Sequence, residues 1–194
     1  MDSHLIESKL KSQELFRGSF LHAFRDTVAL PDGTEASREY VIHPGAVMIV
    51  PLLELPGQPL QLVMERQFRY PVQQVMLEFP AGKLDPNEST LECAQRELFE
   101  ETGYRAKQWA KAGVMHPVIS YSTEFIEIWF AKDLSLGERQ LDPGEFLEVI
   151  TQTPEALKQA CLKGEVTDGK TLTGMFWLQN YLSGQHELTW VNAA

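Results

Sequence analysis

Three glutamates crowd the end of one predicted helix: Glu97, Glu100 and Glu101. Apolar residues recur at helical spacing from Leu91 to Leu98, and Gly103 stands where a helix commonly ends. Carboxylates at this end face the negative pole of the helix dipole, which destabilises the helix by about 0.3–1 kcal/mol each. A chain keeps such a cluster most easily when a cation binds there.

The type of cation follows from the type of ligand. Carboxylates with no Cys or His among them suit a hard, oxygen-seeking ion, so Mg²⁺ is expected, with Mn²⁺ as a substitute. Glu97 and Glu101 lie four residues apart and share one helix face, where like charges repel. The alternative is an acidic helix end that faces solvent, and helix physics alone does not decide between the two.

The spacing of the surrounding residues resembles the Nudix box, G-x5-E-x7-R-E-U-x-E-E-x-G-U, where U is a bulky apolar residue. So many fixed positions in one short stretch make a chance match improbable. The resemblance implies a metal-dependent enzyme that hydrolyses nucleoside diphosphate linkages. The matching residues are Gly82, Glu88, Arg96, Glu97, Leu98, Glu100, Glu101, Gly103 and Tyr104.

The resemblance also implies a set of metal ligands. Glu97 and Glu101 are expected to be the main ligands and therefore catalytic, and Glu100 is expected to bind directly or through water. The backbone carbonyl of Ala81, just before the box, is expected to complete the set. These four residues would hold the Mg²⁺ against a diphosphate.

Two arginines are candidates for binding the substrate. The segment Glu65–Pro71 carries Arg-Gln-x-Arg and resembles the ADP-ribose pyrophosphatase branch of the family. That resemblance assigns a phosphate contact to Arg69 and another substrate contact to Arg38, and a planar guanidinium suits bidentate binding. For each, the alternative is an exposed arginine in a surface salt bridge. Arg96 is expected to pair with Glu88 and to brace the loop instead.

The general base is expected on a separate loop. The segment Pro143–Val149 resembles the loop that carries it in this branch, and Glu145 is preferred over Glu148. A strand over Phe146–Thr151 would fix Glu148, whereas Glu145 at its mobile start could close over bound substrate. Glu124 is a third candidate, in a loop that departs from the Ser-Pro-Gly common in the family.

Composition limits the partners that the chain can have. Its 194 residues are 43% hydrophobic, and a formal net charge of −10 argues against nucleic acid or an anionic membrane as partner. An acidic protein must then draw in a small nucleotide substrate through metal ions and a few arginines. Cys93 and Cys161 form no disulfide pattern, and the start of the chain lacks an apolar signal core, so a cytoplasmic location is expected.

The elements that position these residues are predicted from hydrophobic patterning. Ala46–Leu53 is a continuous apolar run, which indicates a strand buried on both faces. Residues 14–43 indicate a hairpin that turns at Pro31–Thr34, and the polar residues 1–13 suggest a frayed leader. Further strands are expected at 60–68, 74–79, 107–116, 125–131 and 146–151, and helices at 154–162 and 168–182.

This order predicts an α/β fold, a three-layer α/β/α sandwich with a mixed central sheet, preceded by an N-terminal β-hairpin region. The Nudix resemblance implies the same fold. It also divides the chain into residues 1–44, a leader and hairpin similar to the branch's dimerisation element, and residues 45–194, the Nudix hydrolase domain. A homodimer is therefore expected.

The function that the resemblance implies is hydrolysis of ADP-ribose to AMP and ribose 5-phosphate. Another nucleoside diphosphate sugar such as GDP-mannose, or a dinucleotide such as NADH, is the alternative within the same chemistry. A non-catalytic module that senses ADP-ribose or a nucleotide is the alternative of a different class, although such modules typically lose the box glutamates that this chain keeps.

Overall fold

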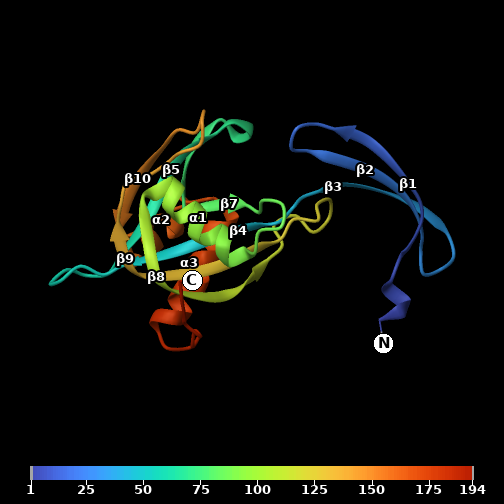
Figure 1. The fold of residues 1–194 in the computed structure, drawn as a ribbon. Helices are drawn as coiled ribbons and strands as arrows, with labels where there is room; N and C mark the ends of the chain where they lie inside the picture. The colour runs from blue at the N-terminus through green and yellow to red at the C-terminus, as the bar shows by residue number, and fades with distance from the viewer. Residues whose placement is uncertain (1, 194) are drawn as a thin grey trace. The chain divides into compact units, whose positions relative to one another are not determined.

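The computed structural model describes residues 2–193, which form two compact units (Figure 1). The first unit comprises the chain up to Gly45 together with the segment His116–Glu124. The second unit comprises Ala46–Met115 and the chain from Phe125 onward. Each unit is built on its own sheet.

The first unit is a three-stranded antiparallel sheet in the order β1-β2-β3. Its strands are β1 (Ser8–Arg17), β2 (His22–Ala29) and β3 (Glu35–Ile42). The turn between β2 and β3 contains Gly33 at a φ of +86°, a left-handed conformation that glycine adopts readily. The hairpin expected with this turn is confirmed.

The frayed leader expected over residues 1–13 is wrong from Ser8 onward. A short 3-10 helix, η1 (Ser3–Leu5), is followed by β1, which pairs with β2 from Ser8↔Ala29 to Arg17↔His22. All 10 residues of β1 are exposed, so no apolar face alternates along it. The strand is held by its backbone pairing with β2. Because such pairing does not depend on side-chain burial, the sequence of β1 shows no hydrophobic periodicity.

The second unit contains a mixed sheet in the order β10-β5-β4-β9-β8-β11, with β6 pairing to β5 and β7 to β4. The neighbours β4 and β9 are parallel, and the other pairs are antiparallel. The strands are β4 (Ala46–Leu53), β5 (Gln61–Arg69), β6 (Gln74–Glu78), β7 (Ala81–Lys83), β8 (Tyr104–Met115), β9 (Ile126–Leu136), β10 (Leu147–Gln152) and β11 (Val191–Asn192).

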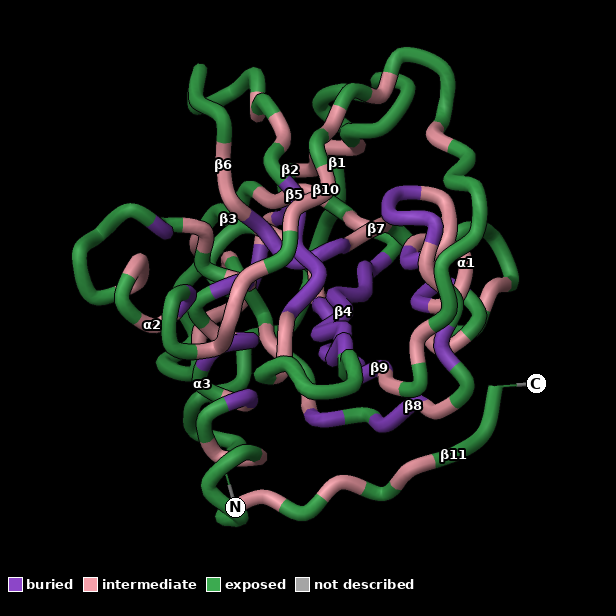
Figure 2. Tube along the Cα trace, turned by 90° about the vertical axis from the view of Figure 1, so that its left-hand side faces the viewer, coloured by how far each residue is buried: buried purple, intermediate pink, exposed green. Residues whose placement is uncertain are grey.

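Strand β4 lies at the centre of the core, as its apolar run predicts, and every one of its residues is buried (Figure 2). Its side chains alternate between two apolar clusters. Met48 and its even-numbered neighbours pack with the helices α2 (Pro154–Leu162) and α3 (Gly169–Leu182). Val47 and Ile49 pack with α1 (Thr90–Thr102). Helices therefore cover both faces, and the predicted α/β/α sandwich is confirmed.

Two strands were not expected from the sequence. β7 has three residues and β11 has two, which is too short for a period-two pattern. A 3-10 turn, η2 (Tyr70–Val72), joins β5 to β6. In the described part of the chain, no helix has the length and apolar character needed to cross a bilayer.

Candidate active site

Helix α1 is fixed at both ends by local sequence. Ser89 is its N-cap and accepts a hydrogen bond from the backbone of Glu92, whose side chain binds back to Ser89 in a capping box. The helix ends at Gly103, with a φ of +78°. Its buried positions, which include Cys93 and Leu98, pack on the sheet and so set the direction in which the box glutamates point.

The short strand β7, where the box begins, contacts two of these glutamates. Glu101 is buried and accepts a hydrogen bond from the backbone N–H of Ala81 (3.1 Å). A Cβ placed on Gly82 would come within 1.8 Å of the Glu97 carboxylate, so Glu97 keeps this position only beside a glycine. The structure thus brings Ala81, Glu97 and Glu101 together, as the box resemblance implies.

Arg96 connects the loop to the helix. Its Nε donates to Glu88 (2.8 Å), and its Nη1 donates to Glu97 (2.7 Å) and Glu100 (3.0 Å). The hydrogen bond from Arg96 lowers the pKa of Glu88 to about 2. The expected pairing of Arg96 with Glu88 is confirmed, and Glu100 is held by the same guanidinium.

One face of β5 contributes a second set of polar groups. Glu65, Gln67 and Arg69 alternate along the strand and share that face. Arg69 binds the buried Glu78 of β6 through Nε (2.7 Å) and Nη2 (2.9 Å). Burial of Glu78 opposes ionisation, but the hydrogen bonds from Arg69 and Lys170 lower its pKa below the usual value.

Glu65 is the functional candidate that the sequence reasoning missed. It is fully buried, and neither carboxylate oxygen has a hydrogen-bond partner among residues 2–193. Burial first, and then the charge of Glu78, raise the pKa of Glu65 to about 8. The signal available in the sequence was a glutamate that directly follows the apolar residues Leu62–Met64.

The proposed base, Glu145, lies on the loop before β10. It accepts a hydrogen bond from Gln67 Nε2 (3.2 Å). Its charge also raises the pKa values of the buried Glu65 and Glu101 and of the partly buried Glu97, so it lies within electrostatic range of all three.

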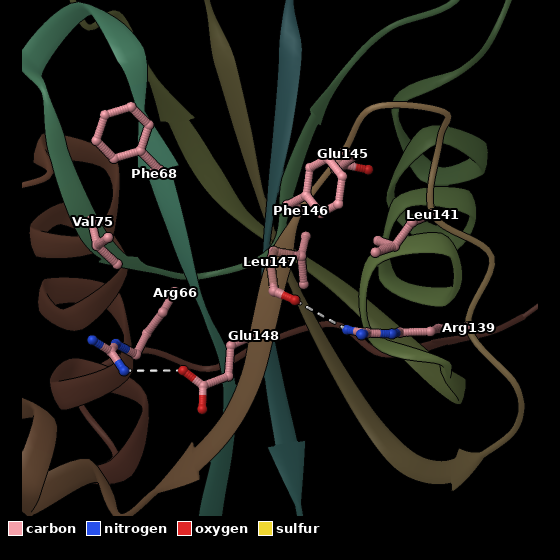
Figure 3. Close-up of a pocket in the computed structure, with 9 residues that line it drawn as sticks. All are labelled: Arg66, Phe68, Val75, Arg139, Leu141, Glu145, Phe146, Leu147 and Glu148. Atoms are coloured by element: carbon pink, nitrogen blue, oxygen red, sulfur yellow. Dashed lines mark hydrogen bonds and ion pairs between the residues drawn. The ribbon is translucent and has the colours of Figure 1, made fainter.

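The other two base candidates have different surroundings. Glu148 is exposed on β10 and pairs with Arg66 (3.0 Å), as Figure 3 shows. Glu124 belongs to the first unit, where its Oε1 lies 3.8 Å from His43 Nε2. Within the second unit, the geometry therefore favours Glu145 over Glu148.

The carboxylates of this site repel one another. Burial, opposed by Arg96 and reinforced by Glu100 and Glu145, raises the pKa of Glu97 to about 7. Burial and the neighbouring glutamates raise the pKa of Glu101 well above its usual value. Like charges are concentrated in a low-dielectric site, which is energetically costly unless a cation or a proton is bound.

This donor set fits Mg²⁺ or Mn²⁺. The groups are carboxylate and carbonyl oxygens, which these hard ions prefer, and their mutual repulsion would be relieved by a divalent charge. Within residues 2–193, no three acidic, imidazole or thiol side chains already stand in the arrangement of a formed metal site. The donors therefore fit these ions in their chemistry and in their charge.

Arg38 lies in the first unit, on β3. Its Nε and Nη2 bind Glu7 at 2.9 and 2.5 Å. In this structure Arg38 therefore forms a surface salt bridge, which was the alternative to a substrate contact. Arg69, in contrast, lies in the second unit, which also contains the box.

An open hollow of about 440 Å³ adjoins Glu145 (Figure 3). Phe68 of β5 and Phe146 of the loop before β10 line it, and Phe146 is 84% exposed. Arg66 and Arg139 line the same hollow together with Glu145 and Glu148, and Arg66 is paired with Glu148. Exposed rings in such a hollow suit stacking against a flat base. Phe68 and Phe146 are the aromatic residues that line this hollow.

Two family models match the chain. Residues 42–173 match the model described as the NUDIX domain. Residues 7–41 match the model described as the nucleoside diphosphate sugar hydrolase N-terminal domain. Together they cover both units of the fold.

Several known proteins are similar over nearly the whole chain. An ADP-ribose pyrophosphatase of Bacillus subtilis is 34% identical over 90% of this chain and 94% of its own length. A methanol dehydrogenase activator of Bacillus methanolicus is 34% identical over 89% and 92%. A crystal structure of an ADP compounds hydrolase superposes with a TM-score of 0.81 at 23% identity, over 92% of this chain and 95% of that one, and supports the fold.

Proposed function

This chain belongs to the Nudix family, and from that premise we propose that it hydrolyses the diphosphate linkage of ADP-ribose to AMP and ribose 5-phosphate. The observation that carries the proposal is the cluster formed by the buried carboxylates of Glu101 and Glu65 and the partly buried carboxylate of Glu97, with Arg69 on the adjoining strand face. Relatives similar over nearly the whole chain, described as ADP-ribose pyrophosphatases, support this substrate.

Four groups would hold Mg²⁺ or Mn²⁺: the side chains of Glu97, Glu100 and Glu101 and the carbonyl of Ala81. When bound, such ions neutralise diphosphate oxygens and lower the pKa of a coordinated water. The cluster needs this neutralisation because its own charge, in a protein of net charge −10, would otherwise repel a diphosphate.

The other residues bind the substrate and move the proton. Arg69, whose side chain is 39% exposed, binds a phosphate of the substrate through its guanidinium. Glu145 removes a proton from the water that attacks phosphorus, and the P–O bond to the leaving phosphate breaks. Gln67 orients Glu145 through the hydrogen bond between them.

The proposal includes the N-terminal region. Two chains associate as a homodimer through the N-terminal region, residues 1–44, which contains the three-stranded sheet, and Arg38 on β3 contacts substrate. Cys93 and Cys161 are both free thiols, which supports a location in the reducing cytoplasm.

The experiment is a substrate panel of ADP-ribose, GDP-mannose and NADH, each with Mg²⁺ and with EDTA. Each reaction is stopped by heat, excess divalent metal is added, and alkaline phosphatase then releases phosphate from the newly exposed phosphate monoesters. Metal-dependent turnover led by ADP-ribose supports the proposal. The match of residues 7–41 favours a second candidate, hydrolysis of another nucleoside diphosphate sugar, and turnover led by GDP-mannose would support that candidate instead. Tight ADP-ribose binding without turnover would contradict both and support a sensor.

A further inference from the structure

Lys170, on the first turn of α3, contacts the strand end that leads into the box. Its Nζ forms ion pairs with Glu78 and with Asp168, the latter at 3.0 Å. The side chain of Glu78 is only 2% exposed and that of Lys170 12%, so solvent screens this contact little. Glu78 is therefore shared by two cations, Lys170 and Arg69.

The place of Lys170 is fixed by contacts other than its charge. Thr171 accepts a hydrogen bond from the backbone N–H of Phe79 (3.2 Å) and donates one to Asp168 (2.6 Å). A Cβ on Gly174 would come within 2.6 Å of Met48 and 3.0 Å of Phe79, so this turn of α3 lies directly on the core. The helix thus holds Lys170 beside Glu78 by packing and by backbone hydrogen bonds.

The sharing of Glu78 affects Arg69. Glu78 Oε2 accepts from Arg69 Nη2 (2.9 Å) and also from Lys170 Nζ. A carboxylate bound to one guanidinium forms a neutral pair, which attracts a phosphate weakly. Lys170 also pairs with Asp168, but it donates to the same Oε2, so this oxygen neutralises less of the positive charge of the Arg69 guanidinium.

We propose that Lys170 is a positioning residue for the substrate: it shares Glu78 with Arg69, and so holds the Arg69 guanidinium in place and available to a phosphate. The inference rests on the proposed function, in which Arg69 binds the substrate phosphate. It assigns a role in binding to the C-terminal helix, which lies outside the Nudix box.

The test is steady-state kinetics of the full-length protein with ADP-ribose and Mg²⁺. Lys170→Met is expected to raise KM about tenfold, the effect of weakening one charged hydrogen bond, and to change kcat less than about threefold. Lys170→Arg keeps the charge and is expected to restore most of the affinity. Lys163→Met is the matched control, because Lys163 is an exposed lysine at the end of α2.

The outcomes separate this inference from the function on which it rests. Wild-type protein that turns over ADP-ribose, with an unchanged KM in Lys170→Met, contradicts the role of Lys170 alone. A fall in kcat at constant KM also contradicts it, because Lys170 would then act on the chemical step. Absence of turnover in the wild type contradicts the proposed function itself. Should Lys170→Met unfold at the assay temperature, Lys170→Gln replaces it, and the same KM criterion decides.

Discussion

At the scale of single residues, the contact between Gly82 and Glu97 determines whether the box can form. The backbone of Gly82 is not in the left-handed region, so an alanine there is excluded by the Glu97 carboxylate and not by its own conformation. Gly82→Ala is therefore expected to displace Glu97 while leaving the fold intact.

We expect Gly82→Ala to lower kcat/KM and Mn²⁺ affinity at least about tenfold, since a ligand displaced by about 1 Å misplaces the reacting groups. Steady-state kinetics with ADP-ribose and calorimetric titration with Mn²⁺ measure the two effects separately, and thermal melting tests whether the fold stays intact. Gly169→Ala is the control, because no atom lies within 4 Å of a Cβ at Gly169. Wild-type metal affinity in Gly82→Ala would contradict the close contact.

The raised pKa of Glu65 predicts how stability depends on pH in EDTA. The pKa of Glu65 is about 8 in the folded protein, against an ordinary value of 4.5, so the folded state binds more protons than the unfolded state between these two pH values. Stability is therefore expected to fall as pH rises from about 5 to 8, by about 1 kcal/mol per pH unit.

Glu65→Gln removes one titrating group and is expected to reduce the slope and to stabilise the protein at pH 8, while the raised pKa values of Glu97 and Glu101 maintain part of the slope in both proteins. Urea unfolding at pH 5 to 9 measures the free energy of unfolding in both proteins. Glu165→Gln, at an exposed glutamate, should leave the profile unchanged. If the free energy of unfolding of the wild type instead rises between pH 5 and 8, Glu65 is ionised and well paired in the folded state.

Sequence reasoning found the residues whose role follows from local spacing and missed those whose role follows from tertiary contacts. The box fixes Glu97 and Glu101 by their positions on one helix. Glu65 and Lys170 carry no such signal, because their surroundings are set by strands and helices distant in the chain: Lys170 is 92 positions from Glu78.

At the scale of elements, helix α1 is stabilised at its N-terminus and destabilised at its C-terminus. The capping box stabilises its N-terminus, whereas Glu97, Glu100 and Glu101 place negative charge at the C-terminal end of the dipole. A divalent cation bound to these carboxylates would remove that penalty, so the stability of the fold should depend on the metal.

We expect saturating Mg²⁺ or Mn²⁺ to raise the melting temperature and EDTA to reverse the effect. At 100 times the Kd the gain is about 2.7 kcal/mol, which corresponds to about 5–10 °C for a protein of this size. Glu97→Gln and Glu101→Gln should lose most of the shift, and K⁺ at equal ionic strength should not reproduce it. If neither Mg²⁺ nor Mn²⁺ changes the melting temperature of the wild type, a metal site at α1 is contradicted.

The elements that the sequence predicted are those with a buried face. β4 has an unbroken apolar run, and α1, α2 and α3 combine an apolar stripe with a recognisable N-cap. β1 gave no such signal because it is exposed throughout, and β7 and β11 are too short to show a period. Hydrophobic patterning reports burial, and it says little about strands held by backbone pairing alone.

At the scale of the whole molecule, the site exists only after the second unit has folded. Its groups come from β5, the β6–β7 connection, α1, the loop before β10 and the start of α3. Alternation of helices and strands predicted the layers, but strand order could not be derived from it. That order sets Glu145 near Glu97 and Lys170 beside Glu78.

The exposed strand β1 leads to the last prediction. It is an edge of the first sheet and presents unpaired backbone groups together with Leu10 and Phe16, which are 55% and 56% exposed. An edge strand of 10 residues with large exposed hydrophobics readily pairs with another chain unless it is covered. This supports the proposed homodimer through residues 1–44.

Sedimentation velocity over a concentration series is expected to show a dimer for the wild type. Leu10→Lys and Phe16→Glu should each weaken the dimer by at least about tenfold, because a charge buried in an apolar interface without a partner costs more than about 1.4 kcal/mol. Leu162→Lys is the control, since Leu162 is equally apolar and 72% exposed but lies on α2. A wild type that sediments as a strict monomer at every concentration would mean that β1 remains an uncovered edge, protected from association by the charged side chains along it, which include Lys9, Lys11, Glu14 and Arg17.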